Sequence, residues 1–206
     1  HQKPLIKTLQ QADYLWTLTQ FETDYFSKNF HINPKKMILS GNGIDPEFLI
    51  KKSKTSNSSI HKSSYMNHES KILFIGSLSA HKGIDNLIKS FSLLLKTNNY
   101  LLPAKLIIAG QPTLYFPEIQ KTIKTLPIKT QKQIKFIYNF PQPKLKKLID
   151  NCDVLILPSQ QESFGLVLIE SWARGKPVIV SNIPALSEIV AKSAGGLIFD
   201  PGNISD

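Results

Sequence analysis

Residues 154–181 read VLILPSQQESFGLVLIESWARGKPVIVS, and this stretch decides the fold of the chain. Apolar runs of strand length stand at both of its ends, at residues 154–158 and 177–181. Between them, residues 164–173 carry apolar side chains at the spacing of a helix. A strand, a helix and a second strand in this order predict a βαβ unit, whose two strands lie parallel.

The same alternation continues toward the N-terminus. The remaining strand candidates are mainly apolar and do not alternate with polar residues, which suits strands buried on both faces, and they cover residues 72–76, 105–110, 134–138 and 196–199. An apolar stripe at three- and four-residue spacing over residues 84–95 predicts an amphipathic helix, and residues 143–149 show a shorter one. The fold class is therefore α/β, a Rossmann-like doubly wound parallel sheet.

The N-terminal third has a different organisation. Residues 12–19 and 36–40 are strand candidates on either side of a predicted helix over residues 20–30, and Gly41-Asn42-Gly43 then predicts a sharp turn or hinge. Residues 51–70 are rich in Lys, Ser, Asn, Thr and His and have few apolar side chains. We expect the remnant of one domain over residues 1–45, a linker or mobile loop over 46–70, and a second domain over 71–206. Because the chain begins at His1 and has no helix after its last apolar run, we also expect an excerpt, truncated at its C-terminus.

Composition limits the function classes. The 206 residues are 41% hydrophobic, enough for a sizeable core, and no apolar run approaches the ~20 residues of a membrane span. The formal net charge is +10, but Arg174 is the only arginine, which argues against a nucleic-acid-binding domain. Cys152 is the only cysteine, so an intrachain disulfide is excluded and a reducing cytoplasm is the expected location.

Ligands of doubly wound sheets bind beyond the carboxyl ends of the strands, and one loop there carries candidate chemistry. If Ser163 caps the following helix, the backbone amides of Phe164, Gly165 and Leu166 point into the crevice and favour a phosphate or a hydroxyl-rich ligand. Glu162 stands at the mouth, and Glu170 lies ~10 Å further along the helix, which suits two ends of one elongated ligand. The alternative is structural, with Glu162 stabilising the helix start and Glu170 on the surface. Glu170, however, lies among apolar neighbours, and a buried carboxylate needs a partner.

Four segments in the right order resemble one family. Glu162 and Glu170, with seven residues between them, resemble the two-glutamate pattern of the GT-B glycosyltransferase family 4, also called glycosyl transferases group 1. Residues 76–83 are similar to that family's first donor-domain loop, and residues 173–181 are similar to its strand after the glutamate helix. Asn42-Gly-Ile-Asp45 resembles the turn that leads from the acceptor domain to the donor domain. The resemblance covers nearly the whole chain from about residue 12.

The resemblance implies a retaining glycosyltransferase that moves a sugar from a nucleotide-diphosphate sugar to an acceptor glycan or lipid-linked sugar, in glycan or cell-envelope polysaccharide biosynthesis. It implies no cofactor and no bound metal. It implies that Glu162 and Lys82 are the catalytic residues. Glu162 would contact the hydroxyls of the donor sugar, Glu170 the ribose hydroxyls, and Lys82 the diphosphate, where it offsets charge on the leaving group. The remaining donor-binding candidates are Gly76, Ser77, Tyr138, Asn139, Phe140, Ser163, Phe164, Gly165 and Leu166.

One departure from the family pattern keeps an alternative open. The family usually carries an arginine directly after the first glycine, where this chain has Ser77 after Gly76. A serine supplies no charge, so Lys82 carries the diphosphate alone, another lysine substitutes, or donor binding is weaker. The alternative function is a non-catalytic nucleotide-sugar-binding or assembly subunit. We expect a cytoplasmic chain that binds no nucleic acid, with peripheral association at the inner membrane face left open, and we expect the excerpt alone to be inactive.

Overall fold

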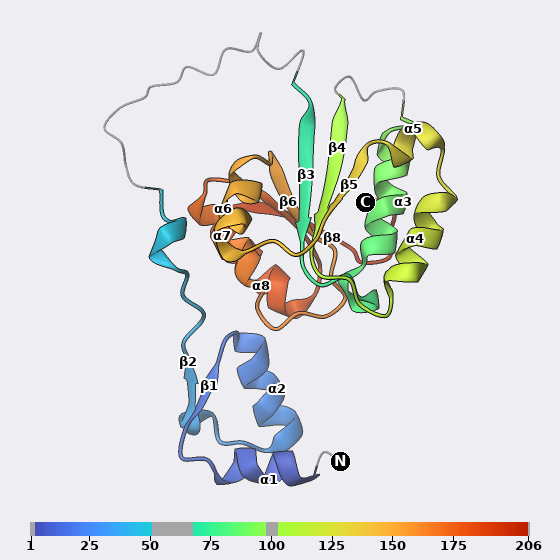
Figure 1. Cartoon of the computed structure of the whole chain (residues 1–206). Helices are drawn as coiled ribbons and strands as arrows, with labels where there is room; N and C mark the ends of the chain where they lie inside the picture. Colours follow the sequence, from blue (N-terminus) through green and yellow to red (C-terminus); the bar gives the residue numbers. More distant parts are fainter. Residues whose placement is uncertain (1–2, 51–67, 98–102, 206) are drawn as a thin grey trace.

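The computed structural model describes residues 3–50, 68–97 and 103–205. Two sheets organise these residues, a two-stranded sheet near the N-terminus and a six-stranded sheet in the rest of the chain. In Figure 1 the small sheet and its helices form a unit below the large sheet. We call these parts the N-terminal unit and, after the role that the resemblance implies for it, the donor-side domain.

The six strands of the donor-side domain are all parallel and stand in the order β5-β4-β3-β6-β7-β8. The order reverses between β3 and β6, the arrangement of a doubly wound sheet, so the predicted fold class is confirmed. The strands are β3 (Ser70–Ile75), β4 (Ala104–Ala109), β5 (Ile134–Ile137), β6 (Val154–Leu157), β7 (Val178–Ser181) and β8 (Gly196–Phe199).

Helices cover both faces of this sheet. They are α3 (Ile84–Leu94), α4 (Phe116–Lys124), α5 (Ile128–Gln131), α6 (Gln142–Asp150), α7 (Leu166–Ala173) and α8 (Pro184–Ser193). Because side chains alternate along a strand, Phe74 of β3 joins a core cluster with α3 and α4, and Leu73 joins a second cluster with α6, α7 and α8. Both side chains are fully buried.

The two faces are not covered to the same extent. On β6, Leu155 and Leu157 are buried against α7 and its neighbours, whereas Ile156 on the opposite face is partly exposed. Ile156 and Ile179 instead line a cavity of about 350 Å³ between α3 and the C-terminal segment. The expectation of strands buried on both faces is therefore wrong for β6 and β7, which are fully buried on only one face. It is also wrong for the two edge strands, because Lys135 of β5 is exposed and Leu197 of β8 is 69% exposed.

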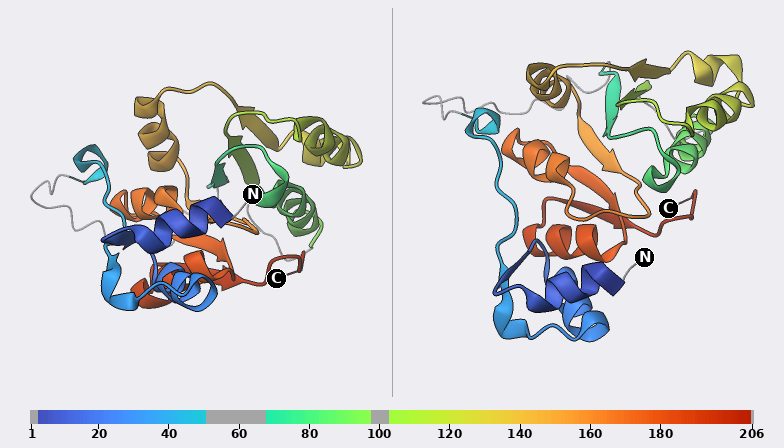
Figure 2. Two further views of the ribbon diagram at one scale, coloured as in Figure 1. Left: turned by 90° about the horizontal axis from the view of Figure 1, so that it is seen from below. Right: turned by 60° about the horizontal axis from the view of Figure 1, so that its bottom comes forward.

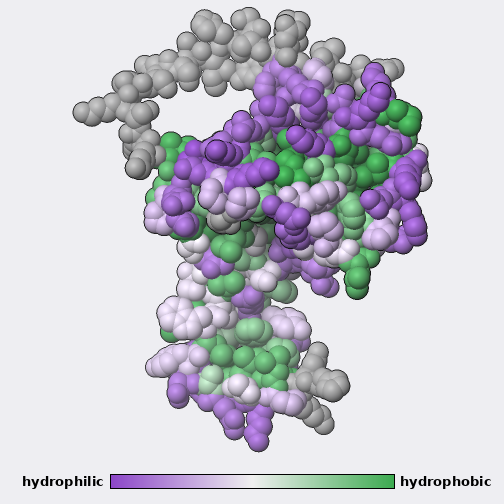
Figure 3. Space-filling view, viewed as in Figure 1, coloured by the Kyte–Doolittle hydropathy of each residue, from purple (hydrophilic) through white to green (hydrophobic). Residues whose placement is uncertain are grey.

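The N-terminal unit is built on a parallel pair of short strands, β1 (Leu15–Thr17) and β2 (Met37–Leu39). Helix α2 (Gln20–Phe30) connects them through the turn η1 (Pro34–Lys36), and α1 (Lys3–Gln11) precedes them. Thr19 caps α2 by accepting a hydrogen bond from the amide of Glu22, and Glu22 in turn accepts one from the amide of Leu18. Figure 3 shows that apolar residues reach the surface of this unit, where Trp16 is 70% exposed.

The segment after β2 is attached to the donor-side domain. Pro46–Phe48 form the 3₁₀ turn η2, and Phe48 is buried in the core cluster that contains Leu73 and Leu155. Arg174 donates a hydrogen bond to the Phe48 carbonyl and pairs with Asp150 on α6. The start of the predicted linker is thus ordered and belongs to the donor-side core, whereas residues 51–67 of that prediction lie outside the described residues.

The carboxyl ends of the large sheet face the N-terminal unit. In Figure 1, β3 and β4 begin at the upper edge of the sheet, and the loops that follow the strands lie at its lower edge. Figure 2, which turns the bottom of the molecule toward the viewer, shows the orange-red α8 next to the blue helices of the N-terminal unit. Contacts between α2 and α8 confirm this arrangement. The loops expected to hold a ligand therefore lie between the two units.

Candidate functional site

Two loops at the carboxyl edge of the sheet are joined directly. The loop after β3 contains the 3₁₀ turn η4 (Ala80–Lys82), and the amide of Gln160, in the loop after β6, donates a hydrogen bond of 2.7 Å to the carbonyl of His81. Gly83 approaches the carbonyl of Pro158 so closely that an added Cβ would lie 2.0 Å from that oxygen. Only glycine fits here, and the contact fixes the first loop against the glutamate loop.

Lys82 and Glu162, the two predicted catalytic residues, form an ion pair in this structure. Lys82 Nζ lies 2.5 Å from Glu162 Oε1, and each side chain is only 16% exposed. The residues are 80 positions apart and come from different loops. The fold therefore brings a cation and a carboxylate together at the edge that faces the N-terminal unit, as the sequence predicts for two residues of one site.

The start of α7 differs from the prediction. Ser163 does not cap the helix, because α7 begins at Leu166 and its N-cap is Gly165, in the left-handed conformation with φ +79° and no side-chain capping bond. The amide of Leu168 bonds to the Gly165 carbonyl, whereas the amides of Phe164, Gly165, Leu166 and Val167 have no hydrogen-bond partner among the described residues. The predicted amides thus remain available although Ser163 is not the cap, and the Phe164 side chain is buried.

Glu170 is a partly buried carboxylate on α7. Burial raises its pKa above the ordinary value of 4.5, because removal from water disfavours the charged form. Within residues 3–50, 68–97 and 103–205, no side chain or amide donates a hydrogen bond to this carboxylate. Such a group is suited to accept hydrogen bonds from ligand hydroxyls, which agrees with its predicted role.

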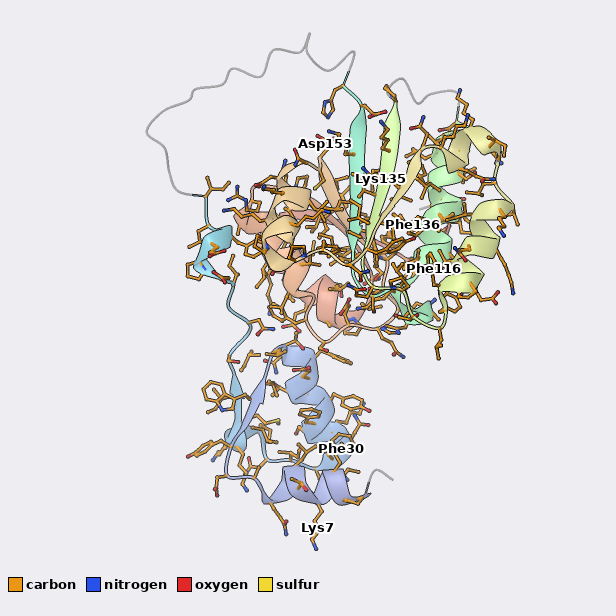
Figure 4. The ribbon with its side chains drawn as sticks, in the orientation of Figure 1. Lys7, Phe30, Phe116, Lys135, Phe136 and Asp153 are labelled. Carbon is orange, nitrogen blue, oxygen red and sulfur yellow. The ribbon has the colours of Figure 1, made fainter. Side chains whose placement is uncertain are left out.

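The loop after β5 divides its residues between the two faces of the sheet. Tyr138 stacks on Phe136 and meets the edge of Phe116, two rings that Figure 4 labels side by side, whereas Phe140 packs against the opposite core cluster. Burial raises the pKa of Tyr138. Asn139 has a left-handed backbone with φ +48°. None of the described hydrogen bonds or ion pairs joins this loop to Lys82 or Glu162.

Gly76 and Ser77 begin the loop after β3. The Gly76 carbonyl is close to Gly110, where an added Cβ would lie 1.7 Å from it, so the loops after β3 and β4 also touch. Ser77 is exposed, and its hydroxyl lies 3.2 Å from that of Ser79. A serine therefore stands, accessible to solvent, at the position where the family pattern has an arginine.

The sequence did not single out Ser159 and Ser181. Ser159 donates a hydrogen bond to Glu162 Oε1 at 3.1 Å, and the Ser181 hydroxyl donates to the Ser159 carbonyl. Both serines are fully buried. The sequence offered only a weak signal for them. Each is a small hydroxyl residue at the end of a buried strand or shortly after it.

A second missed residue is Glu188. It lies inside α8, and its carboxylate accepts hydrogen bonds from the amides of Gln20 and Phe21 at the start of α2. Burial alone raises its pKa, yet the hydrogen bonds from Lys192 and from these two amides outweigh burial, so the net pKa lies below 4.5. Glu188 therefore connects the two units.

A cavity of about 650 Å³ lies between the first loop, α3 and α4. Asp85 on α3 lines it and accepts hydrogen bonds from Tyr115 and Thr122, which raises the pKa of Tyr115 to about 12. The predicted donor-binding residues do not line this cavity. Its polar cluster instead connects α3 to α4.

Three further observations concern the described residues only. They contain no helix long and apolar enough to cross a membrane. They contain no cluster of three or more His, Cys, Asp or Glu side chains able to hold a metal ion. Burial raises the pKa of Cys152 to about 11, which keeps this residue a thiol at neutral pH.

Comparison with known proteins agrees with this geometry. The family model described as "Glycosyl transferases group 1" matches residues 57–206. An uncharacterized glycosyltransferase of Methanocaldococcus jannaschii, MJ1607, is 30% identical over 209 residues, which cover 96% of this chain and 51% of that protein. The O-antigen chain mannosyltransferase RfbU of Salmonella typhimurium is 26% identical over 91% of this chain and 47% of its own length. The chain thus spans about half the length of these relatives.

Solved structures show the same fold. Anabaena Alr3699/HepE, in complex with UDP and glucose, superposes with a TM-score of 0.76 at 20% identity, over 98% of this chain and 54% of that one. WaaG, a glycosyltransferase involved in lipopolysaccharide biosynthesis, superposes with a TM-score of 0.73 at 21% identity, over 96% of this chain and 54% of its own. The predicted GT-B architecture is confirmed by these superpositions.

Proposed function

The chain belongs to the family of glycosyl transferases group 1, and on this premise we propose that it forms the donor-binding part of a retaining glycosyltransferase. The substrate would be a nucleotide-diphosphate sugar, and the acceptor a glycan or a lipid-linked sugar. Anabaena Alr3699/HepE, which shares the fold, was crystallised with UDP and glucose, and RfbU is an O-antigen chain mannosyltransferase. These relatives support a role in the biosynthesis of glycans or cell-envelope polysaccharides.

The Lys82–Glu162 ion pair is the observation that carries this proposal. It joins the loop after β3 to the loop after β6, at the sheet edge that faces the N-terminal unit. A donor bound there would exchange this pair for its own contacts, with Lys82 on the diphosphate and Glu162 on the hydroxyls of the sugar. Glu170, which is partly buried and has no described partner, would accept hydrogen bonds from the ribose.

In the proposed reaction, the bond between the anomeric carbon and the diphosphate oxygen breaks, and a bond to the acceptor oxygen forms. Negative charge then develops on the departing diphosphate. We expect the Lys82 ammonium and the amides of Leu166 and Val167 to stabilise that charge, and loss of one such donor typically costs ~10²–10³ in rate. With a lysine in this role, we propose that no bound metal is needed.

Saturation-transfer NMR of the purified chain tests donor binding. UDP-glucose, GDP-mannose and ADP-glucose serve as probes, each beside its own nucleoside diphosphate and each repeated with Glu170→Ala. We expect one nucleotide to bind and the substitution to weaken it by about tenfold, as for a lost hydrogen bond to a charged group. Absence of binding by all probes, or equal binding to the variant, would contradict the proposal.

A second candidate function is a non-catalytic nucleotide-sugar-binding or assembly subunit, and Ser77 is the observation that favours it. Restoring the family's cation with Ser77→Arg separates the two candidates in the full-length protein. The enzyme proposal expects measurable hydrolysis or transfer of the bound donor before the substitution, and more after it. A subunit without catalytic function would gain donor affinity but show no turnover in either form.

A further inference from the structure

Glu162 receives both of its described hydrogen bonds on one oxygen. Lys82 Nζ lies 2.5 Å and Ser159 Oγ 3.1 Å from Oε1. Among the residues that the structure describes, none donates to Oε2. The second oxygen is therefore available to a ligand while the first is held from the protein side.

The two donors differ in how firmly they are fixed. Ser159 is fully buried, and its carbonyl accepts a hydrogen bond from the hydroxyl of Ser181, which is also fully buried at the end of β7. Ser181 is bonded as well to the carbonyl of Leu157, at the end of β6. Ser159 is thus connected to two strands of the sheet. Lys82, by contrast, reaches Glu162 through a flexible four-carbon side chain.

A diphosphate would compete with Glu162 for Lys82. A diphosphate carries more than one negative charge, whereas a carboxylate carries one, so the lysine is attracted more strongly to the ligand. Glu162 would then lose its ion-pair partner at the moment when it has to hold the sugar. After that exchange, Ser159 is the only described donor left on its side chain.

We propose that Ser159, fixed by Ser181, is a positioning residue that keeps Glu162 directed at the donor sugar after the diphosphate has drawn Lys82 away. This inference rests on the proposed function, in which Lys82 contacts the diphosphate and Glu162 the sugar. Ser159 acts through Glu162 and does not itself touch the donor. Its effect is therefore restricted to ligands that carry a sugar.

The test compares Ser159→Ala with the wild-type chain in isothermal titrations. UDP-glucose and UDP are the first pair of probes, with GDP-mannose and GDP or ADP-glucose and ADP used where those bind. We expect Ser159→Ala to weaken the nucleotide sugar about tenfold, as for a lost hydrogen bond to a carboxylate, and to leave the nucleoside diphosphate unchanged. A parallel loss for both ligands, or no loss for either, would overturn the proposal.

Ser171→Ala is the matched control. Ser171 on α7 is as buried as Ser159, but its hydroxyl has no hydrogen-bond partner in the part of the chain that the structure describes, so we expect its removal to leave both affinities unchanged. A loss in Ser171→Ala equal to that in Ser159→Ala would show a general packing effect and would also overturn the proposal. Ser181→Ala should weaken the nucleotide sugar by a smaller factor, because it loosens Ser159 without removing its hydroxyl.

A second readout does not need a sugar. The carboxyl-carbon NMR signal of Glu162, assigned by its disappearance in Glu162→Gln, is followed while inorganic pyrophosphate is added to draw Lys82 away. We expect one sharp signal in the wild-type chain and a broadened or split signal in Ser159→Ala. Equal behaviour of the two proteins would overturn the role of Ser159. If the wild-type chain binds no nucleotide sugar, the proposed function fails, and this signal still decides the role of the serine.

Discussion

Glu188, on α8 of the donor-side domain, accepts a hydrogen bond of 3.1 Å from the backbone amide of Phe21, 167 positions earlier in the chain. The same carboxylate accepts one from Gln20, while Thr19 caps Glu22. In the first turn of α2, the amide of Glu22 is therefore bonded within the N-terminal unit, whereas the amides of Gln20 and Phe21 are bonded to the donor-side domain. A negative charge at this end of a helix also interacts favourably with the helix dipole.

Glu188→Ala should release the start of α2. We expect faster hydrogen exchange at the amides of Gln20 and Phe21 and a loss of about 1 kcal/mol in the free energy of unfolding, the usual size for a lost helix cap. Lys192→Ala is the control, because Lys192 pairs with the same carboxylate from an exposed position and contacts no amide of α2. Equal exchange in the wild-type chain and Glu188→Ala would show that the interface does not depend on this carboxylate.

The Glu188 contact should also depend on pH. Its folded-state pKa lies below 4.5, so its contribution to stability is present above pH 4.5 and is lost as the pH falls through the folded-state value. We therefore expect the difference in unfolding free energy between wild type and Glu188→Ala to be constant near pH 7 and to shrink below pH 4.5. Urea denaturation at a series of pH values measures it. A difference that grows with acid would contradict the assignment.

Glu162→Gln should change the affinities for the nucleoside diphosphate and for the nucleotide sugar in opposite directions. Without the carboxylate, Lys82 is no longer paired, so we expect the nucleoside diphosphate to bind about fivefold more tightly. The sugar should lose its anchor, so the nucleotide sugar should no longer bind better than the diphosphate. Isothermal titration measures both, and Lys82→Met, which should weaken both ligands, is the comparison. Weaker diphosphate binding in Glu162→Gln would show that the ion pair does not compete with the ligand.

Glu170→Gln should stabilise the ligand-free chain and weaken its binding of the nucleotide. Because the folded-state pKa is raised above 4.5, the ionised side chain destabilises the fold at neutral pH, and this cost is absent in acid, where the group is protonated in both states. We expect Tm at pH 7 to rise by about 2 °C, with no difference near pH 4. Differential scanning calorimetry gives the Tm values. A lower Tm at pH 7 would mean that the carboxylate has a stabilising partner.

Gly83→Ala and Gly41→Ala form a matched pair. Comparing them separates the effect of a steric clash with the Pro158 carbonyl from the effect of backbone strain. Both glycines have left-handed backbones, with φ +68° and φ +64°, but an added Cβ meets the Pro158 carbonyl at Gly83 and nothing within 4 Å at Gly41. We expect about 1 kcal/mol of destabilisation at Gly41 and more than about 3 kcal/mol at Gly83, where backbone must move. Urea denaturation distinguishes them, and equal losses would exclude a role for the loop contact.

The sequence predicted the large sheet well because each strand carries its own signal. All six strand candidates of the donor-side domain are strands, and α3, α6 and α7 lie where apolar spacing placed them. The sequence analysis expected no helix at α4 or α8, each of which has a proline, Pro117 or Pro184, in its first turn. A proline in the first turn of a helix is compatible with it, since the amide that it lacks would have had no partner there.

The site was predicted only in part, for a similar reason. Glu162, Glu170 and Lys82 stand out in the sequence through their spacing and the loops that contain them. Ser159 and Glu188 act through hydrogen bonds to residues that only the folded chain brings near, and no local pattern marks such contacts. The start of α7 was misplaced because Ser163 has the chemistry of a cap, whereas Gly165 has the left-handed backbone that the turn adopts.

The burial of Phe48 limits how far the two units can swing. Ile44 also packs against the donor-side core, and the amide of Ser40 donates a hydrogen bond to the carbonyl of Thr17, so only residues 41–43, which include Gly41 and Gly43, are held by neither unit. An extended chain reaches at most about 3.5 Å per residue, so these residues allow a separation of only roughly 10 Å. If the hydrogen bonds from α2 to Glu188 break, we expect rotation between the two units to be concentrated at residues 41–43.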